Sequence, residues 1–261
     1  MLTVRDVSVG YDGVDVVHRL SFTLAAGERL ALIGPNGCGK TTLLRAIAGV
    51  LPYRGGISVG QRPLDQMKQR ELAREIAMLS QVSAVHFAYS VYDTVMMGRY
   101  AHAGGGLLGL PTEEDRAKVL HCLETVDLLD FKDRLVTELS GGQLQRVFLA
   151  RTLAQDPHII LLDEPTNHLD LRYQIELMEY LKTWVTEGER ALIGVLHDVN
   201  LGMHFCDKVL VMSEGHARAF GKTEKVLTGS LLRETYGPAV VAYMQQSLAL
   251  WERMDSDDSA L

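Results

Sequence analysis

The sequence predicts an α/β fold in which a helical insert interrupts a sheet. Short aliphatic strands alternate with helical patterns before and after residues 83–153, whereas that segment itself is mostly helical. A glycine-rich loop in the first block also follows an apolar strand and opens a helix. Strand-loop-helix units of this kind favour parallel strands in the later part of the chain.

Each expected strand is an apolar run, rich in β-branched residues, that ends at turn signals such as residues 11–13 and 26–28. The first run alternates apolar and polar residues, as a half-buried strand does. The predicted strands cover residues 2–9, 16–24, 29–33, 57–59, 76–79, 159–163, 191–196 and 208–213.

Capping residues mark several helix starts. Ser90 with Asp93, and Thr112 with Asp115, have the spacing with which a first residue caps the helix that follows. Between these two helices, residues 101–111 are rich in glycine and are expected to form a flexible loop. The expected helices cover residues 41–50, 69–74 and 91–98, a helix opened by Thr112, and a helix beginning at Gly141.

Composition excludes some partners. The 26 Lys and Arg residues against 33 Asp and Glu give a net charge of −7, which disfavours nucleic acid and anionic membrane surfaces. Three widely spaced cysteines, Cys38, Cys122 and Cys206, fit reduced thiols better than a disulfide framework. The N-terminus does not resemble a signal peptide, and no apolar run approaches the roughly 20 residues that span a bilayer. If this chain drives transport, another chain must form the channel.

The glycine-rich loop has the pattern of a phosphate-binding loop. Its glycines allow backbone N–H groups to surround a β-phosphate at a helix N-terminus. Lys40 is expected to neutralise β- and γ-oxygens, Thr41 to bind Mg²⁺, and Thr42 to bond the α-phosphate. The predicted loop residues are Gly34, Pro35, Asn36, Gly37, Cys38, Gly39, Lys40 and Thr41.

An acidic pair, Asp163-Glu164, follows a strand of four aliphatic residues. A carboxylate at the end of a buried strand needs a cation to offset its desolvation. We therefore expect Asp163 to hold Mg²⁺, through water, and Glu164 to act as general base or to orient the attacking water.

The segment Ser140-Gly141-Gly142-Gln143 places small residues at a helix start. Taken alone, it is an N-capped helix. Helix N-termini bind phosphate, but the phosphate-binding loop already serves the nucleotide of this chain.

Together, the phosphate-binding loop, the Ser-Gly-Gly-Gln segment and the acidic pair resemble those of the ATP-binding cassette (ABC) ATPases over nearly the whole chain. The resemblance implies a P-loop ATPase core with a mixed sheet, an N-terminal antiparallel β subdomain and an inserted α-helical subdomain. It also implies that Ser140, Gly141, Gly142 and Gln143 bind the γ-phosphate held by a second copy, in a head-to-tail dimer with two ATP molecules.

Four further residues take roles from this resemblance. Tyr11 is similar to the aromatic residue that stacks on adenine, and Gln81 to the glutamine that senses Mg²⁺ and the attacking water. His197 is similar to the histidine that contacts the γ-phosphate, and Asp170 lies in the loop that links the two sites of the dimer. Cys38 stands where Ser or Ala is common, and is expected to add sensitivity to thiol reagents.

The resemblance divides the chain into four segments. Residues 1–82 form the first part of the nucleotide-binding core with the β subdomain, and residues 83–153 form the helical subdomain. Residues 154–250 complete the core, and 251–261 form an acidic tail that is expected to be disordered.

Residues 87–99, 164–170, 196–200 and 226–237 resemble the ATPases of iron-chelate, heme and cobalamin importers. This branch implies a separate transmembrane permease, an extracytoplasmic substrate-binding protein, and a place on the cytoplasmic face of a bacterial or archaeal membrane. Similar segments occur in oxyanion importers, so the cargo stays open.

Other classes are alternatives. An exporter ATPase is the runner-up, and a soluble ABC ATPase that acts on ribosomes or DNA is a further one. The single cassette, the acidic balance and the absence of sustained heptads disfavour the latter. A non-catalytic switch is disfavoured because Glu164, Gln81 and His197 are all present.

Overall fold

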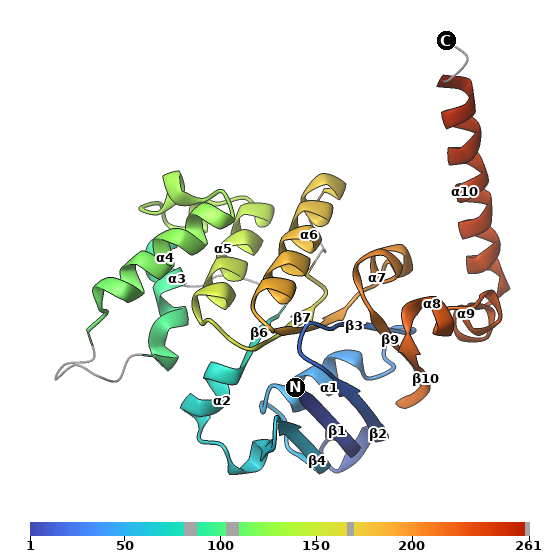
Figure 1. The fold of residues 1–261 in the computed structure, drawn as a ribbon, viewed down its shortest axis with the longest axis horizontal. Helices are drawn as coiled ribbons and strands as arrows, with labels where there is room; N and C mark the ends of the chain where they lie inside the picture. Colours follow the sequence, from blue (N-terminus) through green and yellow to red (C-terminus); the bar gives the residue numbers. More distant parts are fainter. Residues whose placement is uncertain (81–87, 103–109, 166–169, 259–261) are drawn as a thin grey trace.

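The computed structural model describes residues 1–80, 88–102, 110–165 and 170–258, with 252–258 as backbone only. Two sheets and a group of helices make up the fold (Figure 1). The strands are β1 Leu2–Tyr11, β2 Val14–Leu24, β3 Arg29–Ile33, β4 Tyr53–Val59, β5 Arg62–Pro63, β6 Ile76–Leu79, β7 Ile159–Asp163, β8 Ala191–Val195, β9 Lys208–Ser213 and β10 His216–Lys222. The α-helices are α1 Lys40–Ile47, α2 Gln69–Glu75, α3 Val91–Met96, α4 Glu113–Thr125, α5 Gly141–Ala154, α6 Leu171–Glu187, α7 Val199–Phe205, α8 Thr223–Val226, α9 Gly229–Tyr236 and α10 Pro238–Asp258.

The smaller sheet is antiparallel, with strand order β2-β1-β4-β5. The larger sheet has the order β10-β9-β3-β8-β7-β6, in which all neighbours are parallel except β10, which is antiparallel to β9. The predicted fold class is confirmed, with a mixed sheet, an antiparallel N-terminal unit and helices α3–α5 between β6 and β7. The predicted segment boundaries stay predictions.

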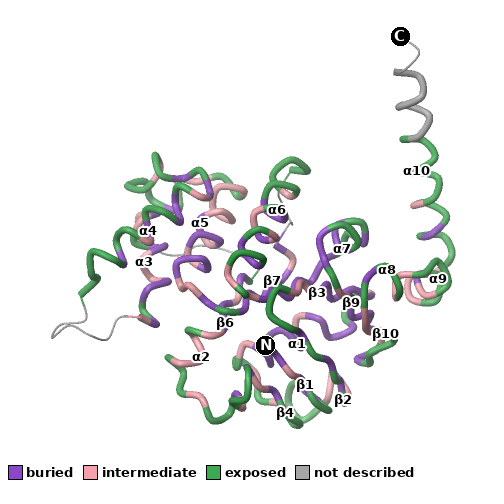
Figure 2. Tube along the Cα trace, viewed as in Figure 1, coloured by how far each residue is buried: buried purple, intermediate pink, exposed green. Residues whose placement is uncertain are grey.

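The larger sheet separates two apolar cores because successive strand residues point to opposite faces. On β3, Leu30 and Leu32 pack with α1 and the smaller sheet, whereas Ala31 and Ile33 pack with the helices of the other face. On β7, Ile159 and Leu161 face the first core in the same way. Figure 2 shows this burial concentrated in the central strands and the helices against them.

The two helix starts that were predicted from capping residues are confirmed. Ser90 accepts a hydrogen bond from the backbone N–H of Asp93, and Thr112 does the same for Asp115. The capped helices therefore begin where their side chains satisfy unpaired backbone donors.

Two expectations are corrected. Strand β10 was not predicted, because its residues are largely exposed and its sequence lacks an apolar run. The backbone of residues 251–258 is helical as the end of α10, whereas a disordered tail was expected. Leu248, Ala249 and Leu250 are good helix formers, and the acidic residues that follow do not break the helix.

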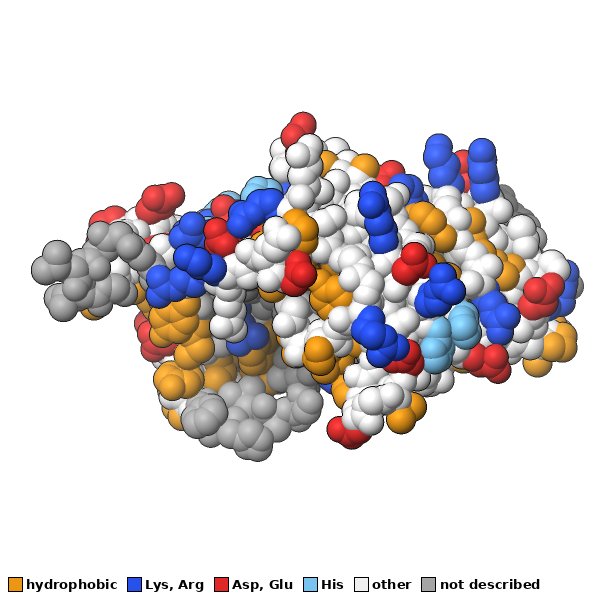
Figure 3. Space-filling view, turned by 90° about the horizontal axis from the view of Figure 1, so that it is seen from below, with side chains coloured by type: hydrophobic (Ala, Val, Ile, Leu, Met, Phe, Trp, Pro, Cys, Tyr) orange, Lys and Arg blue, Asp and Glu red, His pale blue; other side chains and the backbone are white. Residues whose placement is uncertain are grey.

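Acidic and basic side chains are interspersed on the face seen from below (Figure 3). Arg62 and Glu71 form one such exposed pair, and Arg218 and Glu214 another. Exposed pairs of this kind contribute little to stability. Within the described ranges, no helix is long and apolar enough to cross a lipid bilayer.

Candidate active site

Predicted site residues follow adjacent strands of the larger sheet, in the order β3-β8-β7. Strand β3 leads into the phosphate-binding loop, β8 leads to His197, and β7 ends at Asp163 before Glu164. Because the carboxyl ends of parallel strands meet at one edge, segments far apart in the sequence come together. Strand β6 pairs with β7, and Gln81, two residues after β6 in the sequence, lies outside the described residues.

The backbone of the phosphate-binding loop leaves no room for side chains at two glycines. Gly34 has a φ of 150°, and a Cβ on it would lie 2.1 Å from the carbonyl oxygen of Met212. Gly39 caps α1 with a φ of 99°, and a Cβ there would lie 2.8 Å from a methyl carbon of Val17. The packing of this chain itself therefore requires glycine at both positions.

Lys40 lies inside this loop and is only 6% exposed. Its Nζ atom donates hydrogen bonds to the carbonyl oxygens of Gly34 at 2.7 Å and Pro35 at 2.9 Å. These oxygens compensate the buried ammonium group. A cation at the N-terminal end of α1 adds to the positive helix dipole, so the loop is suited to an anion.

Thr41 and Asp163 are joined directly. The Thr41 hydroxyl donates a hydrogen bond of 2.7 Å to Oδ1 of Asp163. Burial raises the pKa of Asp163, the Thr41 bond opposes that effect, and the charge of Glu164 adds to it. A buried carboxylate beside a hydroxyl supplies oxygen donors of the kind that hold a hard divalent cation, which would offset the desolvation. No cluster of three or more His, Cys, Asp or Glu residues suited to a metal occurs in the described part of the chain.

Glu164 and His197 form a close pair. Oε1 of Glu164 lies 2.6 Å from Nε2 of His197. Strands β7 and β8 place them together, since Asp163 is in register with Val195. Glu164 also has a φ of 55°, a conformation that costs a non-glycine residue about 1–3 kcal/mol and persists where the surroundings enforce it. Both side chains are partly exposed at the sheet edge, so they can reach a ligand there.

Tyr11 ends β1 and is 41% exposed. Its hydroxyl accepts a hydrogen bond of 3.3 Å from Arg45, which lies on α1. The tyrosine is thereby connected to the helix that carries Lys40. Arg45 was not predicted as a site residue, because an arginine on an exposed helix position has no distinguishing sequence signal.

The Ser-Gly-Gly-Gln segment forms the capped start of α5. Ser140 Oγ accepts from the N–H of Gln143, and Oε1 of Gln143 accepts from the N–H of Ser140. Ser140 and Gly141 are exposed, and a Cβ on Gly141 would meet no atom within 4 Å. Among the described residues, no contact therefore requires glycine at 141. Asp170 is exposed and caps α6 by accepting from the N–H of Tyr173.

Cys38 is buried in the phosphate-binding loop. This burial raises the pKa of its thiol, an effect that the nearby Lys40 only partly opposes. Because the thiolate is the reactive form, this arrangement disfavours modification by thiol reagents.

Tyr236, on α9, was not predicted to lie near the loop. Its ring packs against the cluster of Val199, Leu232 and Val241. Burial raises its pKa to about 12, while a backbone hydrogen bond at Gly34 opposes that shift. The cluster joins α9 and α10 to the start of α7, two residues after His197, a placement for which the sequence has no local signal.

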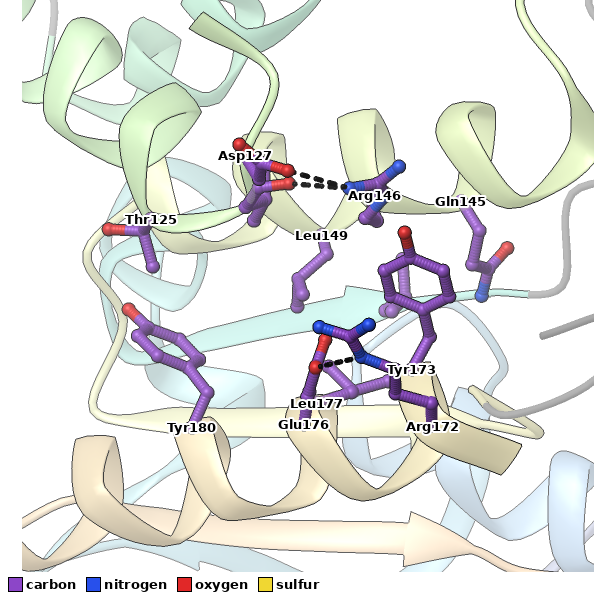
Figure 4. A pocket seen from close by; sticks show the side chains of 12 residues that line it. Thr125, Asp127, Gln145, Arg146, Leu149, Arg172, Tyr173, Glu176, Leu177 and Tyr180 are labelled. Atoms are coloured by element: carbon purple, nitrogen blue, oxygen red, sulfur yellow. Dashed lines mark hydrogen bonds and ion pairs between the residues drawn. The ribbon is translucent and has the colours of Figure 1, made fainter. Parts of the chain in front are cut away.

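A separate pocket lies between α5, α6 and the end of α4, with a volume of about 180 Å³ (Figure 4). Arg146 and Asp127 face Tyr173 across it, and Arg172 pairs with Glu176 at its rim. Among the predicted site residues that the structure describes, none lines this pocket. It marks the joint between the helical insert and the sheet.

The fold and this site define a nucleotide-hydrolysing protein of the phosphate-loop class. The chain belongs to the ABC transporter family, whose model matches residues 17–167. It is thus an ATP-binding subunit, and such subunits of import systems are ATPases coupled to transport.

Two relatives show how far the similarity extends. The hemin import ATP-binding protein HmuV of Deinococcus radiodurans is 38% identical over 245 residues, which are 92% of this chain and 91% of that protein. An uncharacterised ABC transporter ATP-binding protein of Bacillus subtilis, YvrA, is 38% identical over 247 residues. The match covers 94% of this chain but only 56% of YvrA.

Solved structures agree. An inward-facing ABC transporter assigned to the metal-chelate type has a TM-score of 0.77 and 31% identity, covering 90% of this chain and 88% of that one. An ATP-binding cassette solved as a dimer in a post-hydrolysis state, with ADP and Pi, has a TM-score of 0.75 and 25% identity, covering 85% of this chain and 99% of that one. ABC ATPase domains function as such dimers.

Proposed function

We propose that this chain hydrolyses ATP to power the import of a metal chelate through separate permease subunits. The single observation that carries the catalytic part is the convergence of Lys40, Thr41, Asp163, Glu164 and His197 at one sheet edge. The metal-chelate cargo is supported by the similarity to HmuV and to the inward-facing transporter. The proposed place of work is the cytoplasmic face of the membrane.

In this proposal, the backbone N–H groups of residues 34–42 and the Lys40 amine bind the phosphates, and Tyr11 stacks on the base. Thr41 and Asp163 hold Mg²⁺, which neutralises charge on the phosphate oxygens when bound. Glu164 orients the attacking water and accepts its proton. His197 holds Glu164 at 2.6 Å before nucleotide binds and then contacts the γ-phosphate. Gln81 is proposed to sense Mg²⁺ and the water.

The second half of the site is proposed to come from another copy of this chain. Gly141 lies at an exposed helix N-terminus, where a Cβ would meet no atom within 4 Å in the part of the chain that the structure describes. Glycine costs about 1 kcal/mol relative to alanine in a helix, and close approach by a ligand from outside explains its presence. Ser140, Gly141, Gly142 and Gln143 would then bind the partner's γ-phosphate, with Asp170 linking the two sites.

The decisive test is Glu164→Gln. The variant should bind ATP as the wild type does, accumulate a closed dimer, and lose turnover by about 10²–10⁴-fold, the range for a lost proton-transfer group. Steady-state hydrolysis, nucleotide titration and light scattering measure the three properties. Glu187→Gln, at the end of α6, is the matched control and should behave as the wild type. Near-normal turnover in Glu164→Gln would refute the assignment of the base.

The transport part has its own test. Purification from gently solubilised native membranes, followed by mass spectrometry, should recover a multi-spanning permease and an extracytoplasmic binding protein. Recovery with ribosomal proteins alone would remove the import proposal and leave the ATPase assignment in place.

A further inference from the structure

Helix α10 has an apolar stripe that is covered over only half its length. Val241, Met244, Leu248 and Trp251 follow one another at spacings of three and four residues, which places them on one face. The first two pack against the cluster around Val199. Leu248 is 61% exposed and Trp251 65% exposed, and Figure 2 shows this part of α10 mostly exposed.

The exposed half of α10 lacks the charged side chains of a typical solvent-facing helix. Residues 238–251 contain no charged side chain, although solvent-facing helices normally carry charges on their outer side. Tyr243 and Leu250 are also exposed and widen the apolar surface. An apolar surface of this kind on an otherwise charged protein indicates an interaction site.

Helix α10 starts at the edge of the nucleotide site. It directly follows α9, and its Val241 packs against Val199, which lies two residues after His197 of the candidate site. From there α10 extends away from the rest of the molecule (Figure 1). In the proposed head-to-tail dimer the partner subunit covers the phosphate-binding loop, so the exposed half of α10 extends from the border of that interface.

A lipid surface fits the exposed half of α10 less well than a protein surface does. The 14 uncharged residues 238–251 are fewer than the roughly 20 that span a bilayer. The sequence that follows contains Glu252, Asp255, Asp257 and Asp258 against the single Arg253. Such an acidic end is repelled by the negative surface of the cytoplasmic leaflet.

We propose that residues 243–251 of α10 dock on a second copy of this chain in the nucleotide-bound dimer. The proposal rests on the dimer closure of the proposed function and adds a contact outside the nucleotide interface. Because the start of α10 packs against Val199, two residues after His197, this contact would link dimer formation to the candidate site.

The test compares two variants in the Glu164→Gln background, which holds the closed dimer. The first combines Leu248→Gln and Trp251→Gln. The second, Tyr100→Gln, removes an equally exposed aromatic side chain from the helical insert and is the control. With Mg²⁺ and ATP, sedimentation velocity should give a dimer dissociation constant raised about tenfold or more for the first variant, as for lost apolar anchors, and unchanged for the control. Both variants should bind ATP with normal affinity.

Hydrogen exchange of the unmodified Glu164→Gln protein is the independent measurement. The backbone of 243–251 should become protected with ATP, when the dimer forms, and should exchange freely with ADP. Equal dimerisation of both variants, or no protection in a formed dimer, would overturn the contact alone. Protection gained instead on phosphatidylglycerol vesicles would also overturn it, in favour of lipid. If Glu164→Gln stays monomeric with ATP, the proposed closure of the dimer is wrong, and the proposed contact of α10 is wrong as well.

Discussion

The phosphate-binding loop and the start of α5 are both glycine-containing helix N-termini, but they differ in what their glycines serve. At Gly34, a Cβ would collide with the backbone of Met212, and the loop binds its own Lys40. At Gly141, a Cβ would meet nothing, and Ser140 is exposed. The first region is completed by its own chain. In the second, no described contact requires glycine, which supports the proposal that α5 supplies half of a site shared with another copy.

The largest effect should come from Gly34→Ala. The new Cβ would lie 2.1 Å from a backbone oxygen, so the loop must move, which should cost about 2–4 kcal/mol of stability as other strained substitutions do. Nucleotide binding should fall below detection. Thermal melts and fluorescent-nucleotide titration measure both. The matched Gly141→Ala variant should melt at or slightly above the wild-type temperature, since alanine favours helix. If Gly34→Ala and Gly141→Ala lower the melting temperature equally, the proposed difference between the two glycines is wrong.

Gly141→Asp should separate folding from catalysis. An aspartate suits a helix N-terminus, so the melting temperature and ATP binding by the monomer should be unchanged. The carboxylate would repel the partner's phosphate, and ATP hydrolysis should fall by about 10²-fold, as for a lost group that stabilises transition-state charge. Retained hydrolysis would show that α5 does not approach phosphate.

Asp163→Asn should stabilise the nucleotide-free protein while abolishing most hydrolysis. Burial raises the pKa of Asp163, so at neutral pH the folded chain holds its carboxylate less favourably than the unfolded chain does. Asparagine removes that cost and can still accept the Thr41 bond. The gain should shrink as pH falls through the raised pKa and the wild-type carboxyl protonates. Melts of both proteins from neutral to acidic pH test this, and a lower melting temperature for the variant at neutral pH would contradict it.

The smallest effect should come from Ser140→Ala. It removes one side of the capping box of α5 and should cost about 1 kcal/mol, which lowers the melting temperature by about 2–4 °C in a chain of this size. Ser90→Ala, the same change at the cap of α3, is the control. Ser90→Ala should lower the free energy of unfolding by a similar amount, and its hydrolysis rate should fall only as far as the unfolded fraction explains. Ser140→Ala should reduce the hydrolysis rate of the folded protein as well.

Sequence reasoning succeeded where the signal is local. The caps at Ser90, Thr112 and Ser140 depend on residues three positions apart, and the aliphatic strands around the site are buried on both faces. The class of fold could be predicted because these strands flank a helical segment.

Sequence reasoning failed where contacts between distant residues determine the local structure. Strand β10 is held by pairing with β9 and not by its own composition. The packing of Tyr236 against Val199 and Val241 depends on how the last helices lie against α7. Cys38 was expected to add sensitivity to thiol reagents because it stands where Ser or Ala is common, yet packing buries it. The roles of Gln81 and Asp170 stay predictions.

The bonds from Lys40 to the carbonyls of Gly34 and Pro35 also set a threshold for entry. A ligand must draw the ammonium group away from two oxygens that already satisfy it. A nucleoside offers no competing charge, and a monophosphate offers little, whereas a triphosphate offers several oxygens at once. We therefore expect the loop to favour ligands with longer phosphate chains, whatever base they carry.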